Sequence, residues 1–92
     1  LQTWVTLYPR DAAAWQAIAQ VWQAQNQPLR ALRAEGEAQA AHYDYAAAVD
    51  RFRAGQELAR RGGTQNDHFE ASIIDTRLRA TQELLREQTA ER

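Results

Sequence analysis

Few residues of this sequence are of types that carry out chemistry, and their spacing does not assemble a catalytic centre. The histidines are His42 and His68, and there is no cysteine, whereas a zinc site requires three or four converging ligands. Ser72 lies in a predicted helix without an indicated base or oxyanion hole. The pair Gly62-Gly63 lacks the lysine of a phosphate-binding loop. We therefore predict that the chain itself is not an enzyme and holds no metal or cofactor.

The charge balance excludes further classes of function. Eleven basic and twelve acidic residues give a net charge of −1, which argues against nucleic-acid binding and against a basic membrane-binding patch. No apolar run approaches the roughly 18 residues of a membrane-spanning helix. Four arginines either bind an acidic peptide or belong to a solvent-exposed helix surface, and we favour the second interpretation. They are Arg51, Arg53, Arg60 and Arg61.

The clearest structural element is an amphipathic helix between Pro9 and Asn26. Its apolar residues recur at the i, i+3, i+4 and i+7 positions of one helix face, and Asp11 is a suitable N-cap. The stripe consists of Trp15, Ile18, Ala19 and Trp22. This succession of large, medium, small and large residues has the form of the tetratricopeptide signature W-x2-L-G-x2-Y. The small residue in that signature lets a second helix approach closely.

Three further helices are predicted, over residues 28–41, 44–60 and 67–88. Asn26 suits the left-handed position that ends the first helix. Gly36 indicates close packing, because glycine within a helix costs about 1 kcal/mol relative to alanine. Asp67 and Glu70 have the spacing of a capping box at the start of the last helix. The apolar face of that helix is predicted to contain Phe69, Ile73, Ile74, Leu78, Leu84 and Leu85.

These elements predict an all-α fold, an antiparallel helix-turn-helix stack that forms a tetratricopeptide-like right-handed superhelix of about four helices plus the end of a preceding one. We divide the chain into the truncated end of a preceding repeat helix (1–9), three repeat-like helices (10–62) and a long C-terminal capping helix (63–92). Two repeat registers fit. Either the first helix opens a repeat or, because Ala48-x3-Phe52 matches the A-x3-F element, the second helix does.

The predicted stack leaves a polar surface free for protein binding. In such a solenoid, the first helix of each repeat turns one face to its neighbours and another to the concave surface. Because Trp15, Ile18 and Trp22 face inward, three glutamines lie together on the exposed side of the first helix. Three charged residues lie on the corresponding side of the third helix. The predicted protein-binding face consists of Gln16, Gln20, Gln23, Asp50, Arg53 and Glu57.

Three stretches of the chain are similar to a known family, namely TLYPRDAAAW, Gln27 to Arg60 and DHFEASIIDTRLRATQELLREQ. They resemble the C-terminal repeat region of the β-barrel assembly-enhancing family of periplasmic zinc metalloproteases. The segment from Phe69 to Arg77 is its most specific part. In that family an N-terminal HExxH domain holds zinc and cleaves protein, and the repeat region engages outer-membrane β-barrel precursors and their assembly machinery. No position of this chain matches the catalytic motif, so the resemblance implies zinc only in a catalytic domain that precedes it.

The resemblance implies a substrate-presentation module of a periplasmic protease that acts in outer-membrane protein assembly and quality control. Its expected partners are its own protease domain and β-barrel precursors or their assembly factors, with no nucleic acid. The alternative is a free-standing tetratricopeptide adaptor with no attached enzyme. An HExxH motif encoded upstream would select the protease. A dimer of the isolated chain through Leu1, Trp4 and Val5 also stays open.

Overall fold

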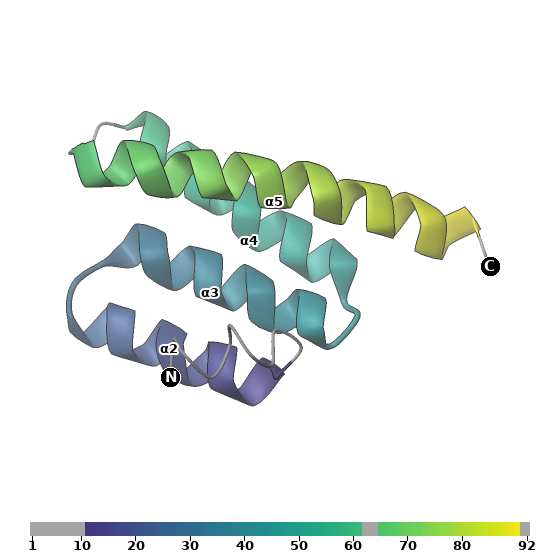
Figure 1. The fold of residues 1–92 in the computed structure, drawn as a ribbon, viewed down its shortest axis with the longest axis horizontal. Helices are drawn as coiled ribbons and strands as arrows, with labels where there is room; N and C mark the ends of the chain where they lie inside the picture. Colours follow the sequence, from purple (N-terminus) through teal and green to yellow (C-terminus); the bar gives the residue numbers. More distant parts are fainter. Residues whose placement is uncertain (1–10, 62–64, 91–92) are drawn as a thin grey trace.

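The computed structural model describes residues 11–61 and 65–90, and it confirms the predicted all-α class for them. The described residues form four helices, each packed antiparallel against the one before it (Figure 1). These helices are α2 (Ala12–Ala24), α3 (Pro28–Ala41), α4 (Tyr45–Arg60) and α5 (Gln65–Ala90). The predicted end of a preceding helix, at residues 1–9, lies outside the described residues.

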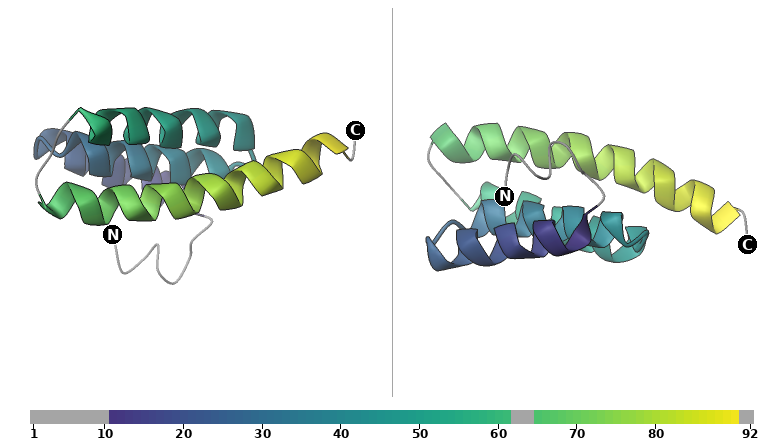
Figure 2. Two further views of the ribbon diagram at one scale, coloured as in Figure 1. Left: turned by 90° about the horizontal axis from the view of Figure 1, so that it is seen from above. Right: turned by 60° about the horizontal axis from the view of Figure 1, so that its bottom comes forward.

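Helix α3 is the centre of the stack. It packs against α2 on one side and α4 on the other, and it also contacts α5, which lies mainly on α4. Among the described helices, α2 contacts α3 alone. Two views show α5 on one side of the other three helices, with its C-terminal end extending beyond them (Figure 2). Helices α2 and α5 therefore stand apart, with α3 between them.

The predicted helix ends follow local chemistry and are largely confirmed. The carboxylate of Asp11 accepts a hydrogen bond from the backbone N–H of Ala14 at 3.0 Å, and Asp44 caps α4 in the same way through Ala47 at 3.1 Å. Asn26 has a φ of 59°, the left-handed conformation that its place after α2 predicts. These contacts satisfy backbone donors that the first turn of a helix leaves without a partner.

The packing explains why α3 contains a glycine and a ladder of alanines. Gly36 faces the ring of Phe52, which is fully buried, and a Cβ added at Gly36 would lie 2.5 Å from Cε1 of that ring. On the α2 side, Ala34 and Ala38 belong to a cluster with Trp15. Small side chains on both faces of α3 therefore allow α2 and α4 to approach it closely. The expectation of a packing role for Gly36 is confirmed.

Helix α5 differs from the prediction at its start. It begins at Gln65 rather than near Asp67, and Glu70 is buried and bound to Arg33 of α3 instead of serving a capping box. Phe69 is 72% exposed, so its assignment to the apolar core face was wrong. At about 100° per residue, Phe69 lies about 140° around the helix from the fully buried Ile74, whereas Glu70 lies only about 40° from it.

Candidate functional site

A groove runs between α2 and α5, with α3 as its floor. Its volume is about 670 Å3. The lining residues are Ile18, Val21 and Trp22 of α2, Arg30 and Arg33 of α3, and Phe69, Glu70 and Ile73 of α5. The groove therefore joins helices that are distant in sequence and that do not pack against each other. We call it the α2–α5 groove.

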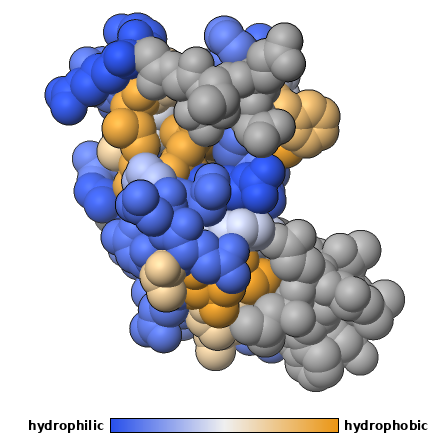
Figure 3. All heavy atoms as spheres, turned by 90° about the vertical axis from the view of Figure 1, so that its left-hand side faces the viewer, coloured by the Kyte–Doolittle hydropathy of each residue, from blue (hydrophilic) through white to orange (hydrophobic). Residues whose placement is uncertain are grey.

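The walls of the α2–α5 groove are apolar and open to solvent. Val21 is 44% exposed and Phe69 is 72% exposed, and they are two of the three large apolar side chains that the described residues expose. Trp22 and Ile73 are half-buried, and Ile18 is buried at the base. Figure 3 views the end of the molecule where the α2–α3 turn and the start of α5 lie, and there apolar surface alternates with hydrophilic side chains.

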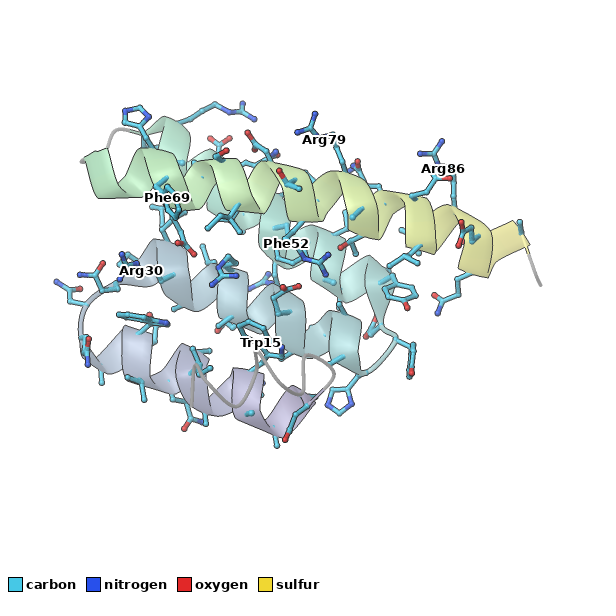
Figure 4. The ribbon with its side chains drawn as sticks, in the orientation of Figure 1. Trp15, Arg30, Phe52, Phe69, Arg79 and Arg86 are labelled. Carbon is cyan, nitrogen blue, oxygen red and sulfur yellow. The ribbon has the colours of Figure 1, made fainter. Side chains whose placement is uncertain are left out.

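Two arginines one turn apart on α3 contact the tryptophans of α2. The guanidinium carbon of Arg30 lies 4.8 Å from the ring centroid of Trp22, and that of Arg33 lies 5.6 Å from the ring centroid of Trp15. In such a cation–π contact, the positive guanidinium is attracted to the face of the aromatic ring. Figure 4 shows Arg30 on the first turn of α3, on the side where Phe69 projects from α5.

The two arginines differ in their partners. Nε of Arg33 donates to Oε1 of Glu70 at 2.5 Å, and the Glu70 side chain is only 7% exposed. Arg30 has no carboxylate partner among the described residues. A charge-assisted hydrogen bond in a partly buried place orients both of its groups. The Arg33 side chain is therefore held by α5, and in the described part of the chain Arg30 is the groove cation without a carboxylate partner.

The six residues of the predicted binding face lie on two helices, α2 and α4. Gln16, Gln20 and Gln23 are exposed on α2, as predicted. Exposed on α4 are Asp50, Arg53 and Glu57. Helices α2 and α4 do not contact each other, because α3 lies between them. None of the six lines the α2–α5 groove. Their role in binding stays a prediction.

The charged patch of α4 is partly neutralised by neighbouring arginines. Asp50 accepts a hydrogen bond from Arg51 at 2.6 Å, and this contact raises the pKa of the Arg51 guanidinium. Glu57 lies 3.7 Å from Arg60 one turn further on. Arg53 lines a second hollow of about 710 Å3 between α4 and the end of α5. Exposed ion pairs of this kind contribute little to stability.

The residues considered for chemistry do not converge on one site, because His42 follows α3 whereas His68 and Ser72 lie one turn apart on α5. His42, His68 and Ser72 are all exposed. Across residues 11–61 and 65–90, no three His, Cys, Asp or Glu side chains lie close enough together to hold a metal ion. No helix in this part of the chain is long and apolar enough to cross a membrane.

Sequence reasoning missed the α2–α5 groove, although its residues carried a signal. Trp22 and Ile18 were placed correctly on the inner stripe of α2, but the stripe was assigned wholly to helix packing. On α5, Phe69 and Ile73 lie one turn apart and both point about 100° or more away from Ile74. A second apolar stripe on a helix indicates a second surface to be covered.

Comparison of the chain with protein-family models, curated proteins and solved structures found no match. Its function is therefore argued from the geometry of its surface. The feature that distinguishes that surface is the groove, because it combines exposed apolar side chains with a cation that has no carboxylate partner in the described part of the chain.

Proposed function

We propose that this chain is a non-catalytic protein-interaction module that binds an apolar segment of another protein in the α2–α5 groove. The observation that carries the proposal is the exposure of Val21 and Phe69 on opposite walls of a groove of about 670 Å3. Fully burying one such side chain contributes about 1.5–3 kcal/mol. A partner that covered both would gain about 2–3 kcal/mol from these two residues, since each is already partly covered.

The order of helix contacts supports a tetratricopeptide-like arrangement in the second of the two registers. In that register α3 and α4 form one repeat, and α5 opens the next. The first helices of neighbouring repeats then touch, as α3 and α5 do. Helix α2 would be the second helix of a preceding repeat, which fits its lack of contact with α4. The first helices α3 and α5, which form the floor and one wall of the groove, would then belong to the concave surface of the solenoid.

The resemblance to the periplasmic metalloproteases suggests which partner fills the groove. We propose that the module presents outer-membrane β-barrel precursors, or their assembly factors, to a protease domain in the periplasm. Such a role needs an adaptable apolar surface, because a precursor exposes apolar residues before it folds. The groove supplies exposed apolar side chains on both of its walls, Val21 on α2 and Phe69 on α5.

Site-specific crosslinking tests this function and locates the surface. A photoreactive amino acid replaces Phe69 in the groove, or Gln20 on the exposed side of α2, and each variant is irradiated in a bacterial envelope extract. Mass spectrometry then identifies the crosslinked proteins. We expect outer-membrane β-barrel proteins or their assembly factors at position 69 and none at position 20. Crosslinks at position 20 alone would place binding on the glutamine face, and none at either position would refute the proposed function.

A further inference from the structure

We infer that the ligand of the α2–α5 groove is an amphipathic helix with an acidic side chain beside its apolar face, and that Arg30 binds this carboxylate. The inference rests on the proposed function and narrows its ligand to a helical segment, which an assembly factor supplies more readily than the strand segments of a β-barrel precursor. It follows from two properties of the groove: the walls offer no backbone partners, and one of the arginines has no carboxylate in the described part of the chain.

The walls favour a helical ligand over an extended one. Both walls and the floor are helices, and outside the first turn of α3 the backbone N–H and C=O groups of the described lining residues are bonded within α2, α3 and α5 or at their ends. The groove therefore presents no free strand edge. An extended segment would press its own N–H and C=O groups against Ile18, Val21, Phe69 and Ile73, and a buried polar group without a partner is costly. A helix satisfies its backbone internally and can lay an apolar face into the groove.

The charges of the lining call for one negative charge on the ligand. Among the described residues, Arg30 and Arg33 line the groove together with one acid, Glu70, which is bound to Arg33. The groove therefore keeps the positive charge of Arg30. A ligand that covered this guanidinium without a counter-charge would remove it from water at a cost. A carboxylate on the ligand replaces the lost water with a charge-assisted hydrogen bond.

The position of Arg30 indicates a side-chain carboxylate. Arg30 projects from the floor helix, and Trp22 and Phe69 belong to the two walls on either side of it. The ring of Trp22 lies under its guanidinium at 4.8 Å. A helix that contacts both walls presents its flank to Arg30, and an Asp or Glu one turn from the apolar residues reaches the guanidinium. The terminal carboxylate of a chain lies at the end of such a helix and not on the flank that faces Arg30, so we infer a side-chain carboxylate.

A displayed peptide library tests this inference. The library consists of helical peptides of about 16 residues, long enough for helical structure in isolation, with one face and its flanks randomised. The baits are the 92-residue chain and its Arg30→Gln, Arg79→Gln and Val21→Gln/Phe69→Gln variants. Arg79 is an exposed arginine on the outer side of α5, so its variant loses the same charge outside the groove.

We expect the unaltered chain and Arg79→Gln to select helices with an Asp or Glu at one fixed position beside the apolar face. Arg30→Gln should select apolar helices without that preference. For an amidated synthetic peptide, replacing the selected Glu by Gln should weaken binding about tenfold to the unaltered chain, and leave binding to Arg30→Gln unchanged.

Other outcomes separate this inference from the proposed function. Apolar helices selected without an acidic position, or an acidic preference that survives in Arg30→Gln, would overturn the role of Arg30 and leave the groove as a binding site. Selection of proline-containing extended peptides, or of peptides that bind only with a free terminal carboxylate, would overturn the helical ligand. If no selected peptide depends on Val21 and Phe69, both the inference and the proposed function fail.

Discussion

Replacing Gly36 by alanine should destabilise the protein even though alanine is the better helix former. A Cβ at this position would lie 2.5 Å from Cε1 and 2.8 Å from Cδ1 and Cζ of Phe52. Ordinary contact begins at 3.4 Å, so this separation must widen by about 0.9 Å. Phe52 is fully buried, and its ring is rigid. The movement therefore has to come from the α3 and α4 backbones.

The magnitude follows from two opposing effects. Alanine in place of glycine within a helix gains about 1 kcal/mol. Overpacking a dense core costs about 1–3 kcal/mol, and more where a rigid group opposes the new atom. Because the Phe52 ring is rigid, we expect a cost in the upper part of this range, about 2–3 kcal/mol, and so a net loss of about 1–2 kcal/mol. For a domain of this size, that loss lowers Tm by roughly 5–15 °C.

Gly55 provides the matched control, because it is also a buried helical glycine. A Cβ there would lie 2.9 Å from Cδ1 of Ile74, the flexible end of that side chain. Gly55→Ala should therefore change stability by less than Gly36→Ala. Denaturant unfolding followed by circular dichroism measures both variants, and Gly36→Ala combined with Phe52→Leu should regain part of the loss. A Gly36→Ala protein as stable as the parent would refute the close approach of α3 and α4.

Three further substitutions test other contacts by denaturant unfolding. Thr81 is fully buried and its hydroxyl has no hydrogen-bond partner among the described residues, so Thr81→Val should stabilise the protein by about 1 kcal/mol; a loss would reveal a hydroxyl partner. Glu70→Ala leaves Arg33 unpaired beside α5 and should lower the free energy of unfolding by about 2 kcal/mol. An unchanged midpoint of unfolding would contradict this contribution of the Arg33–Glu70 pair. Asp44→Ala removes the cap to Ala47 and should cost about 1 kcal/mol, whereas Asp44→Asn should cost little.

The sequence predicted the features that depend on local chemistry. Asp11 caps α2 as predicted, because its carboxylate reaches an N–H group three residues ahead, and Asp44 does the same at the predicted start of α4. Asn26 takes the left-handed conformation because its side chain tolerates a positive φ. The role of Gly36 was also evident, since a glycine within a helix needs a packing reason. These effects act within one helix or across one close contact.

The features that depend on the relative placement of three helices were not predicted. The sequence places Phe69 on the same apolar face as Ile74, although its angle around α5 directs it into the groove. Glu70 was read as a cap because of its spacing from Asp67, although it faces α3 and binds Arg33. The spacing of residues within one helix does not predict an ion pair between α3 and α5. The angle of each residue relative to Ile74 would have been the better guide.

The central claim is that the α2–α5 groove is the binding surface. The most direct measurement compares the affinity of a library-selected helical peptide for the unaltered chain, for Val21→Gln/Phe69→Gln and for Gln20→Ala/Ser72→Ala. Both double variants change exposed residues of α2 and α5, but only the first pair lines the groove. Losing about 2–3 kcal/mol of apolar contact should weaken binding to the groove variant by roughly 30-fold or more, with no change for the control. Equal affinities for all three proteins would contradict the account.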